Sequence, residues 1–351
     1  MDSTENVYKK GPYVMDVINI HGSRGSISAP RVDADIRTKN AHLLHKFVEE
    51  CRATGMVGDA DDFLKRQEFW ETSTFGGNTS CVEVILGGKR FVFDMGTGAR
   101  LLGNSLIREM FEKGGITFTI LLSHTHWDHI QGFPFCGPLF VNKNETPAGI
   151  KNYVDIYGGT NYMEDIEACL KGQMEHQVFP VTWEYLKHIN HHLLTHPIGD
   201  MERIPVDDVN LFTRMLNHPG GSLGYRMEHK GKVIAYTTDN EPFDRTTPHP
   251  PLLQLASGAD YWITDCQYLW EVYTGELGGV CRMGWGHSYP LAVATTAKLA
   301  NVKHVVLFHH DPASSDERIA QIENQVRLEL EKINASHIRV SAAYDGMQLI
   351  L

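Results

Sequence analysis

The chain has 351 residues, with 32 lysines and arginines against 43 aspartates and glutamates, which gives a formal charge of −11. Hydrophobic residues make up 42% and charged residues 21% of the sequence, a balance that is ordinary for a folded globular protein and excludes general disorder. The acidic balance also argues against a general nucleic-acid binder, because neutralising phosphates requires clustered lysine and arginine. It does not exclude a small anionic substrate that is held by a metal.

Histidine and cysteine usage points to a metal site in a reducing compartment. The 19 histidines are more than we expect by chance, several lie in tight groups, and histidine is the commonest metal ligand. The 6 cysteines are scattered without a C-x-x-C pair, which fits a cytoplasmic protein. Residues 1–5 lack the layout of a signal peptide, and no apolar run approaches the roughly 20 residues that cross a bilayer. We therefore expect a cytoplasmic protein without a membrane partner.

In chain order, apolar and β-branched runs predict strands, and amphipathic stretches between them predict helices. The strands are expected at 13–20, 80–86, 90–94, 117–123, 223–228, 232–237, 261–265, 303–309 and 347–351. The helices are expected at 36–51, 291–300 and 316–333. Strands pair early and helices become frequent late, and this order favours an α/β sandwich with mixed sheets.

Two segments interrupt this pattern. Residues 142–205 show little strand pattern and several turn residues, which indicates an insertion or a lid over the site. Residues 31–70 indicate a second, helical insertion near the N-terminus. We expect the whole chain, 1–351, to form a single domain that carries these two insertions.

The strongest local signal is the pattern His124-x-His126-x-Asp128-His129, which places three imidazoles and a carboxylate within six residues. It follows 116–122, a run apolar enough to be a buried strand, and side chains in a loop after a strand can converge on one point. Imidazole nitrogen and carboxylate oxygen both suit zinc, manganese or iron. The pattern therefore indicates a divalent-metal site rather than a solvated polar loop.

This pattern resembles the signature of the metallo-β-lactamase superfamily, whose fold is an αββα four-layer sandwich with metals at one edge. The resemblance implies three further ligands, in a fixed order along the chain. They are matched by His218, by Asp239 at the end of a later strand, and by His309 at the end of a strand near the C-terminus. His310 is the alternative to His309, because strand alternation lets only one of the two face the metals easily.

The resemblance implies two divalent metal ions, with Zn²⁺ as the first candidate and Mn²⁺ or Fe²⁺ as alternatives. The ligands that it implies are His124, His126 and His218 on one metal, Asp128, His129 and His309 on the other, and Asp239 as the bridge.

Two further motifs resemble features of the ribonuclease Z-like phosphodiesterases. Asp94 ends a strand before the metal motif, and in this superfamily such an aspartate supports a ligand histidine by a hydrogen bond; a surface turn is the alternative. His287 and Ser288 match a His-Ser/Thr motif whose histidine assists at the phosphate or leaving group. The start of a helix would add a positive dipole end for an anion there, and a histidine that caps the helix is the alternative.

Other motifs resemble a bacterial group of metallo-hydrolases related to ribonuclease Z. They are Arg24-Gly25-Ser26, the run 76–81 and the run 218–226. Arg24, Arg226 and Ser288 are candidates for substrate contact, and a structural ion pair is the alternative for each arginine.

The resemblance therefore implies a dinuclear-metal hydrolase that cuts a small anionic phosphodiester such as a cyclic nucleotide. Asp128 or Asp239 could orient the nucleophile, and His287 would help the leaving group depart. A ribonuclease Z-like RNA endonuclease is an alternative, but the chain lacks that enzyme's basic, glycine-rich arm, so extended nucleic acid is not expected. A lactone or thioester hydrolase is a second alternative, and a non-catalytic protein that binds a metal or nucleotide is a third. A homodimer is implied by the resemblance alone.

Overall fold

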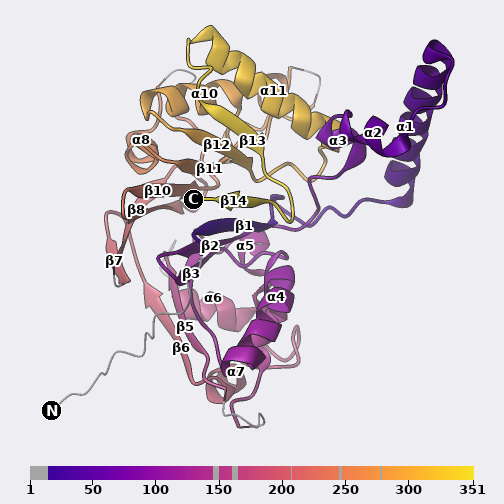
Figure 1. Ribbon diagram of the computed structural model, residues 1–351. Coiled ribbons are helices and arrows are strands. Elements are labelled where there is room, and N and C mark those ends of the chain that lie inside the picture. The colour runs from indigo at the N-terminus through magenta and orange to yellow at the C-terminus, as the bar shows by residue number, and fades with distance from the viewer. Residues whose placement is uncertain (1–14, 145–149, 160–164, 207, 245–246, 277–278) are drawn as a thin grey trace.

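The protein is an αββα sandwich. The computed structural model describes residues 15–144, 150–159, 165–206, 208–244, 247–276 and 279–351. Residues 1–5, and positions 13 and 14 of the first predicted strand, lie outside these ranges. Two seven-stranded mixed sheets pack face to face, and helices cover their outer faces (Figure 1). This arrangement confirms the predicted fold class.

The first sheet combines the N-terminal half of the chain with the last strand, in the order β14-β1-β2-β3-β4-β5-β6. Its strands are β1 (Val17–Gly22), β2 (Cys81–Leu86), β3 (Lys89–Phe93), β4 (Thr117–Leu122), β5 (Tyr153–Gly158), β6 (His192–Pro197) and β14 (Gln348–Ile350). The pairs from β3 to β6 are parallel and the pairs from β14 to β3 are antiparallel. The carboxyl ends of β3 and β4 therefore lie at the same edge.

The second sheet repeats this design in the order β13-β12-β11-β10-β9-β8-β7. Its strands are β7 (Arg203–Val206), β8 (Val209–Leu216), β9 (Ser222–His229), β10 (Lys232–Thr237), β11 (Tyr261–Asp265), β12 (His304–Phe308) and β13 (Arg339–Ala342). The pairs from β10 to β13 are parallel and the others are antiparallel. Between the sheets, the ring of Phe93 stacks on that of Tyr236 with centroids 4.7 Å apart.

Helices bury one apolar face against each sheet. The first sheet is covered by α4 (Ala99–Lys113), α6 (Ile166–Gly172) and α7 (Trp183–Ile189), and the second by α8 (Pro250–Ala256), α10 (Pro290–Leu299) and α11 (Asp316–Lys332). On α4 the buried Leu102, Leu106 and Met110 recur every four residues, as one helical face requires. Among the described residues, no helix combines the length and apolar character that a membrane span needs.

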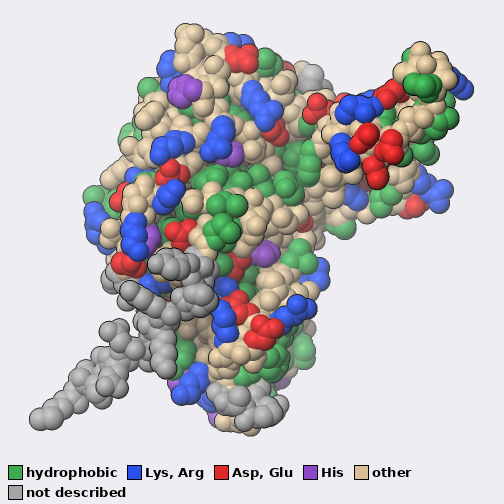
Figure 2. Space-filling model, in the orientation of Figure 1, with side chains coloured by type: hydrophobic (Ala, Val, Ile, Leu, Met, Phe, Trp, Pro, Cys, Tyr) green, Lys and Arg blue, Asp and Glu red, His purple; other side chains and the backbone are tan. Residues whose placement is uncertain are grey.

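Residues 31–70 fold as helices, as predicted. They form α1 (Asp33–Thr54), α2 (Ala60–Lys65) and α3 (Phe69–Thr72), and α1 projects from the side of the sandwich (Figures 1 and 2). No residue of α1 is buried. Lys39 and Lys46 attach the helix through ion pairs with Asp316 and Glu71, at 2.8 and 2.7 Å.

The described parts of residues 142–205 correct the expectation of little strand structure. They contain β5 and β6, which continue the first sheet by parallel pairing. Val154 and Ile156 on β5, and Leu193 on β6, are buried in the core beneath the covering helices. The other face of these strands carries mainly tyrosine, aspartate and histidine, with Leu194 as the aliphatic exception, so each strand has only a few aliphatic residues and its pattern is weak in the sequence. These strands lie in the sheet rather than over the site.

Arg24 joins the end of β1 to the loop that follows β12. Its side chain is fully buried, at 0% exposure. Nε donates to the carbonyl of Gly76 at 2.9 Å, and Nη1 donates to the carbonyls of Asp311 and Ser314, each at 2.9 Å. Nε and Nη1 are thus held by backbone carbonyls, and the remaining nitrogen, Nη2, lies 4.0 Å from Asp316 Oδ1.

Replacing Arg24 by alanine should lower the free energy of unfolding by about 3 kcal/mol, because three backbone carbonyls lose a buried donor. Urea unfolding followed by circular dichroism measures this loss. The matched control is Arg37→Ala on the exposed surface of α1, where the side chain pairs with Asp33 at 2.7 Å and is 79% exposed. The control should change stability by no more than about 0.5 kcal/mol. Equal effects of the two substitutions would contradict the structural role of Arg24.

Candidate metal centre

Five strand ends meet at one edge of the sandwich. Asp94 follows β3, His124 comes shortly after β4, Asp239 after β10, Asp265 ends β11 and His309 follows β12. These strands belong to the parallel halves of the two sheets, whose carboxyl ends share an edge. Polar side chains placed there can converge from distant parts of the chain.

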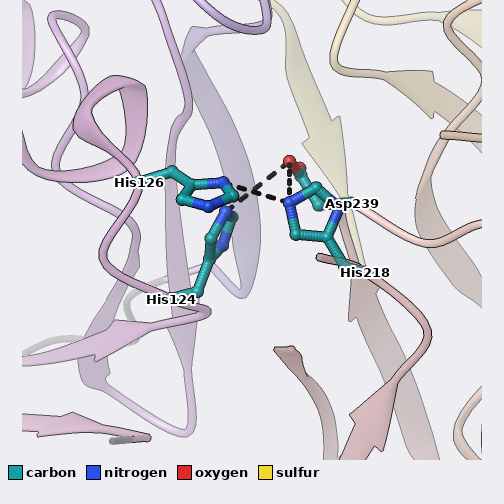
Figure 3. Close-up of side chains that lie close together, drawn as sticks. All are labelled: His124, His126, His218 and Asp239. Atoms are coloured by element: carbon teal, nitrogen blue, oxygen red, sulfur yellow. Dashed lines mark hydrogen bonds and ion pairs between the residues drawn. The ribbon is translucent and has the colours of Figure 1, made fainter. Parts of the chain in front are cut away.

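A first group of side chains consists of His124, His126, His218 and Asp239, which point toward one another (Figure 3). Their ligand atoms all lie within 4.8 Å of one another. His218 Nε2 is 3.1 Å from His126 Nδ1, and Asp239 Oδ2 is 3.7 Å from Nε2 of both His124 and His218. The structure thus brings together the four residues predicted for one metal and the bridge.

A second group consists of Asp128, His129 and His309, whose ligand atoms also lie within 4.8 Å of one another. Asp128 Oδ2 is 3.3 Å from His129 Nε2 and 3.1 Å from His309 Nε2. The other oxygen of Asp239, Oδ1, is 3.5 Å from His129 Nε2 and 3.2 Å from His309 Nε2. Each oxygen of Asp239 therefore faces one group, which is the placement expected of a bridging ligand.

The buried nitrogens of this cluster fit divalent cations. Nε2 of His124 and Nε2 of His129 are buried without a hydrogen-bond partner. Their Nδ1 atoms are occupied, since that of His124 lies 3.0 Å from Ser123 Oγ and that of His129 lies 2.8 Å from Asp94 Oδ2. Burial, and then the neighbouring His129, hold the pKa of His124 well below its usual range, so this imidazole is neutral as a ligand must be. A cation would satisfy both free nitrogens.

Asp94 orients two of the candidate ligand histidines through hydrogen bonds. It is fully buried and accepts hydrogen bonds from Ser123 N at 2.7 Å and from Tyr236 Oη at 2.7 Å, besides its contact with His129. Ser123 in turn contacts His124, so one carboxylate orients two candidate ligands. This is the supporting position that the sequence predicts for Asp94.

Backbone strain concentrates at the same edge. Asp94, Asp239 and His309 have φ angles of 58°, 54° and 58°, in the left-handed region that residues other than glycine rarely adopt. Such positions cost about 1–3 kcal/mol each and persist where the surrounding structure fixes them. Here the strain turns each side chain inward directly after a strand.

The Arg24-Gly25-Ser26 motif supports the second group. A side chain at Gly25 would place its Cβ 2.4 Å from the His309 ring, so only glycine leaves room for that imidazole. Ser26 N donates to Asp128 Oδ2 at 2.6 Å. The motif therefore shapes the site through its backbone.

The structure distinguishes His309 from His310. His309 belongs to the second group, whereas His310 Nε2 lies 2.9 Å from the carbonyl oxygen of Ala343. Burial, and then the charge of Arg24, lower the pKa of His310 to about 3, so His310 is a neutral structural residue. His309, the residue first matched from the sequence, is the one brought to the cluster.

His287 lies beside both groups. Its ring centroid is 5.0 Å from that of His309 and 5.5 Å from that of His218. Nδ1 of His287 is 2.6 Å from Asp265 Oδ2. Burial lowers the pKa of His287, but the charge and hydrogen bond of Asp265, together with the charges of Asp239 and Asp128, outweigh this effect and raise the pKa to about 9. Ser288 N donates to Asp265 Oδ1 at 3.0 Å, so the same carboxylate fixes the whole His-Ser motif.

Asp265 was missed in the sequence, although a signal was present. Asp265 is the last residue of the buried apolar strand β11, and Asp239 lies in a similar position just after β10. Arg226 and Arg24, in contrast, are not brought to the cluster. Arg226 pairs with Glu228 at 2.6 Å and donates to the carbonyls of Leu255 and Ser257, so its guanidinium is held between β9 and the end of α8.

Comparison with known families agrees with this geometry. A family model described as a beta-lactamase superfamily domain matches residues 90–310, more than half of the chain. The chain belongs to the metallo-β-lactamase superfamily. Membership confirms the resemblance seen in the sequence, at the level of a superfamily hydrolase with a site for divalent metal ions. A comparison with curated proteins finds no match.

Several solved structures share the fold of this superfamily member. Unliganded yeast PDE1 is 14% identical, with a TM-score of 0.60, and the match covers 97% of this chain and 100% of that one. A diphosphatase from the PhnP family is 15% identical, with a TM-score of 0.53 and coverage of 96% and 98%. The short form of human tRNase Z is 17% identical, with a TM-score of 0.52 and coverage of 95% and 98%.

Replacing Asp239 by alanine removes the only carboxylate that faces both groups among the described residues. Protein that has been stripped with a chelator should therefore bind two equivalents of Zn²⁺ when unsubstituted and fewer when Asp239 is alanine, as measured by calorimetry and elemental analysis. His188→Ala, on the exposed end of α7, is the control that should retain both equivalents. Full zinc binding by the Asp239 variant would contradict the bridging placement.

Replacing Asp94 by asparagine should weaken zinc binding about 10–100-fold, because the charged acceptor that orients His129 is lost. Competition with a chromophoric chelator measures the affinity. Asp260→Asn is the control, since this carboxylate pairs with Lys303 at the surface, at 2.7 Å. An unchanged affinity in the Asp94 variant would show that Asp94 does not support the centre.

Proposed function

We propose that the protein is a dinuclear-metal phosphodiesterase that cleaves a small phosphodiester such as a cyclic nucleotide. The observation that carries this proposal is the His287–Asp265 pair, which stands 2.6 Å apart directly beside the two ligand groups. A carboxyl-ester hydrolase needs no such partner for its leaving group. The names of the related folds, yeast PDE1, a diphosphatase and tRNase Z, all refer to phosphate chemistry and support the same class.

The residues that would hold the two cations are His124, His126 and His218 for one, Asp128, His129 and His309 for the other, and Asp239 between them. Zn²⁺ is the first candidate and Mn²⁺ or Fe²⁺ are the alternatives for this mixture of nitrogen and oxygen donors. When bound, such ions lower the pKa of a water molecule toward neutrality and offset charge on a phosphoryl oxygen.

The chain's own residues would supply orientation and a proton. Ser26 N and the neighbouring histidines fix the carboxylate of Asp128, which can orient the attacking water. His287 keeps Nδ1 against Asp265, so its Nε2 is the nitrogen that can donate a proton. As the phosphorus–oxygen bond to the leaving group breaks, that proton would pass from His287 to the departing oxygen. Asp265 would stabilise the imidazolium before the transfer.

Replacing His287 by alanine should reduce kcat for cyclic nucleotides roughly 10²–10⁴-fold while zinc content stays constant, because the general acid is lost. The loss should be much smaller for bis(p-nitrophenyl) phosphate, whose phenolate leaves without protonation. Both rates are measured on zinc-loaded protein, with elemental analysis of each variant.

Three results would contradict this assignment. Equal losses on both substrates would show that His287 does not protonate the leaving group. Hydrolysis of lactones or thioesters that does not depend on His287, with no phosphodiester cut, would favour the carboxyl-ester alternative. Calorimetric binding of a cyclic nucleotide without any turnover would favour a binding protein. The homodimer and the cytoplasmic location stay predictions.

A further inference from the structure

The loop before His287 is fixed by a buried carboxylate. Glu241 is only 8% exposed and accepts hydrogen bonds from Gly284 N at 2.7 Å, from Gly286 N at 2.9 Å and from Tyr273 Oη at 2.5 Å. The two amide groups flank Trp285 on either side. Hydrogen bonds to a charged acceptor are among the stronger ones, so the backbone around Trp285 is held rigidly.

This loop also packs directly on the metal centre. Gly286 has a φ of +90°, and a Cβ there would lie 2.0 Å from His218 Nδ1 and 2.5 Å from Pro219 Cδ. The carbonyl oxygen of Gly286 lies 3.1 Å from His218 Nδ1. Gly286, which contacts the candidate ligand His218, is therefore the single residue between Trp285 and His287.

The side chain of Trp285 is partly exposed to solvent, although the backbone around it is fixed. Its side chain is 50% exposed, and the guanidinium of Arg282 lies 5.8 Å from its ring centroid. Arg282 lies in turn 5.0 Å over the ring of Tyr268, whose centroid is 5.9 Å from that of His287. These side chains form a continuous layer that leads from the exposed indole to the proposed acid.

We propose that Trp285 is a stacking platform for a planar ring carried by the leaving-group side of the substrate. A single exposed apolar side chain is ordinary on a protein surface, but Glu241 fixes the backbone on either side of Trp285, which lies two residues before His287, the group that would protonate the leaving oxygen. Bases stack on aromatic side chains irrespective of their sequence, and Arg282 adds a cation to the layer. The inference rests on the proposed function and narrows it to nucleoside or aryl phosphodiesters.

The test compares zinc-loaded full-length wild type, Trp285→Ala and Trp285→Phe on two kinds of substrate, with hydrolysis followed by ³¹P nuclear magnetic resonance. One kind is adenosine or uridine cyclic phosphate, and the other is the cyclic phosphate of ribose without a base. Trp285→Ala should raise KM about tenfold for both nucleoside substrates and leave it unchanged for the substrate without a base. Trp285→Phe should restore most of the lost affinity, and kcat and zinc content should stay constant.

The matched control is Phe111→Ala, which removes a 57% exposed aromatic side chain from α4. It should change neither KM. If Trp285→Ala leaves KM for the nucleosides unchanged, or raises KM for both kinds of substrate equally, the stacking role is wrong while the phosphodiesterase assignment stands.

A binding measurement separates failure of the inference from failure of the proposed function. If wild type cuts neither substrate, the proposed function is wrong, and calorimetry with adenosine monophosphate and ribose phosphate still tests Trp285. Tighter binding of the nucleotide by wild type, lost in Trp285→Ala, would support the stacking role. Equal binding of the two phosphates by wild type would overturn it.

Discussion

The carboxylate of Asp239, with one oxygen toward each of two groups of buried histidines, is the contact on which the site depends. Burying imidazoles and carboxylates without cations is unfavourable, and the free Nε2 atoms of His124 and His129 show where the missing interactions would be. Two features hold the candidate ligand atoms together. One is the strained backbone after β3, β10 and β12, and the other is the hydrogen bonding of the buried Asp94. The strain and the burial lower the stability of this region, and they keep the candidate ligands in a fixed arrangement.

Much of this centre could be predicted because the residues match the motif and the ligand order of the superfamily that the sequence resembles, and because Asp239 and His309 follow strands with buried apolar runs. The choice between His309 and His310 could not be settled by alternation, since it depends on the space left by Gly25 and on the distant carbonyl of Ala343. The structural role of Arg24 could not be predicted, because its three carbonyl partners lie far from it in the chain. Asp265 was overlooked because no neighbouring motif accompanies it, although it completes the pair with His287.

The sandwich was predictable as a class, but not its full extent. The hairpin strands and the long helix α11 carry strong local periodicity, whereas β5 and β6 mix polar with apolar side chains and are paired only through parallel contacts with strands distant in the chain. The same limitation applies to function, because one fold hosts many reactions and only the side chains at the site separate them. Here we propose that the His287–Asp265 pair and Trp285 are the features that would select a phosphodiester.

Anomalous diffraction from crystals of zinc-loaded protein would show whether two cations share this cluster with Asp239 between them. We expect two zinc peaks, each with nitrogen ligands at about 2.0–2.1 Å and with one oxygen of Asp239. The first peak should contact His124, His126 and His218, and the second Asp128, His129 and His309. A single peak, or a second zinc bound by His310 in place of His309, would contradict this expectation.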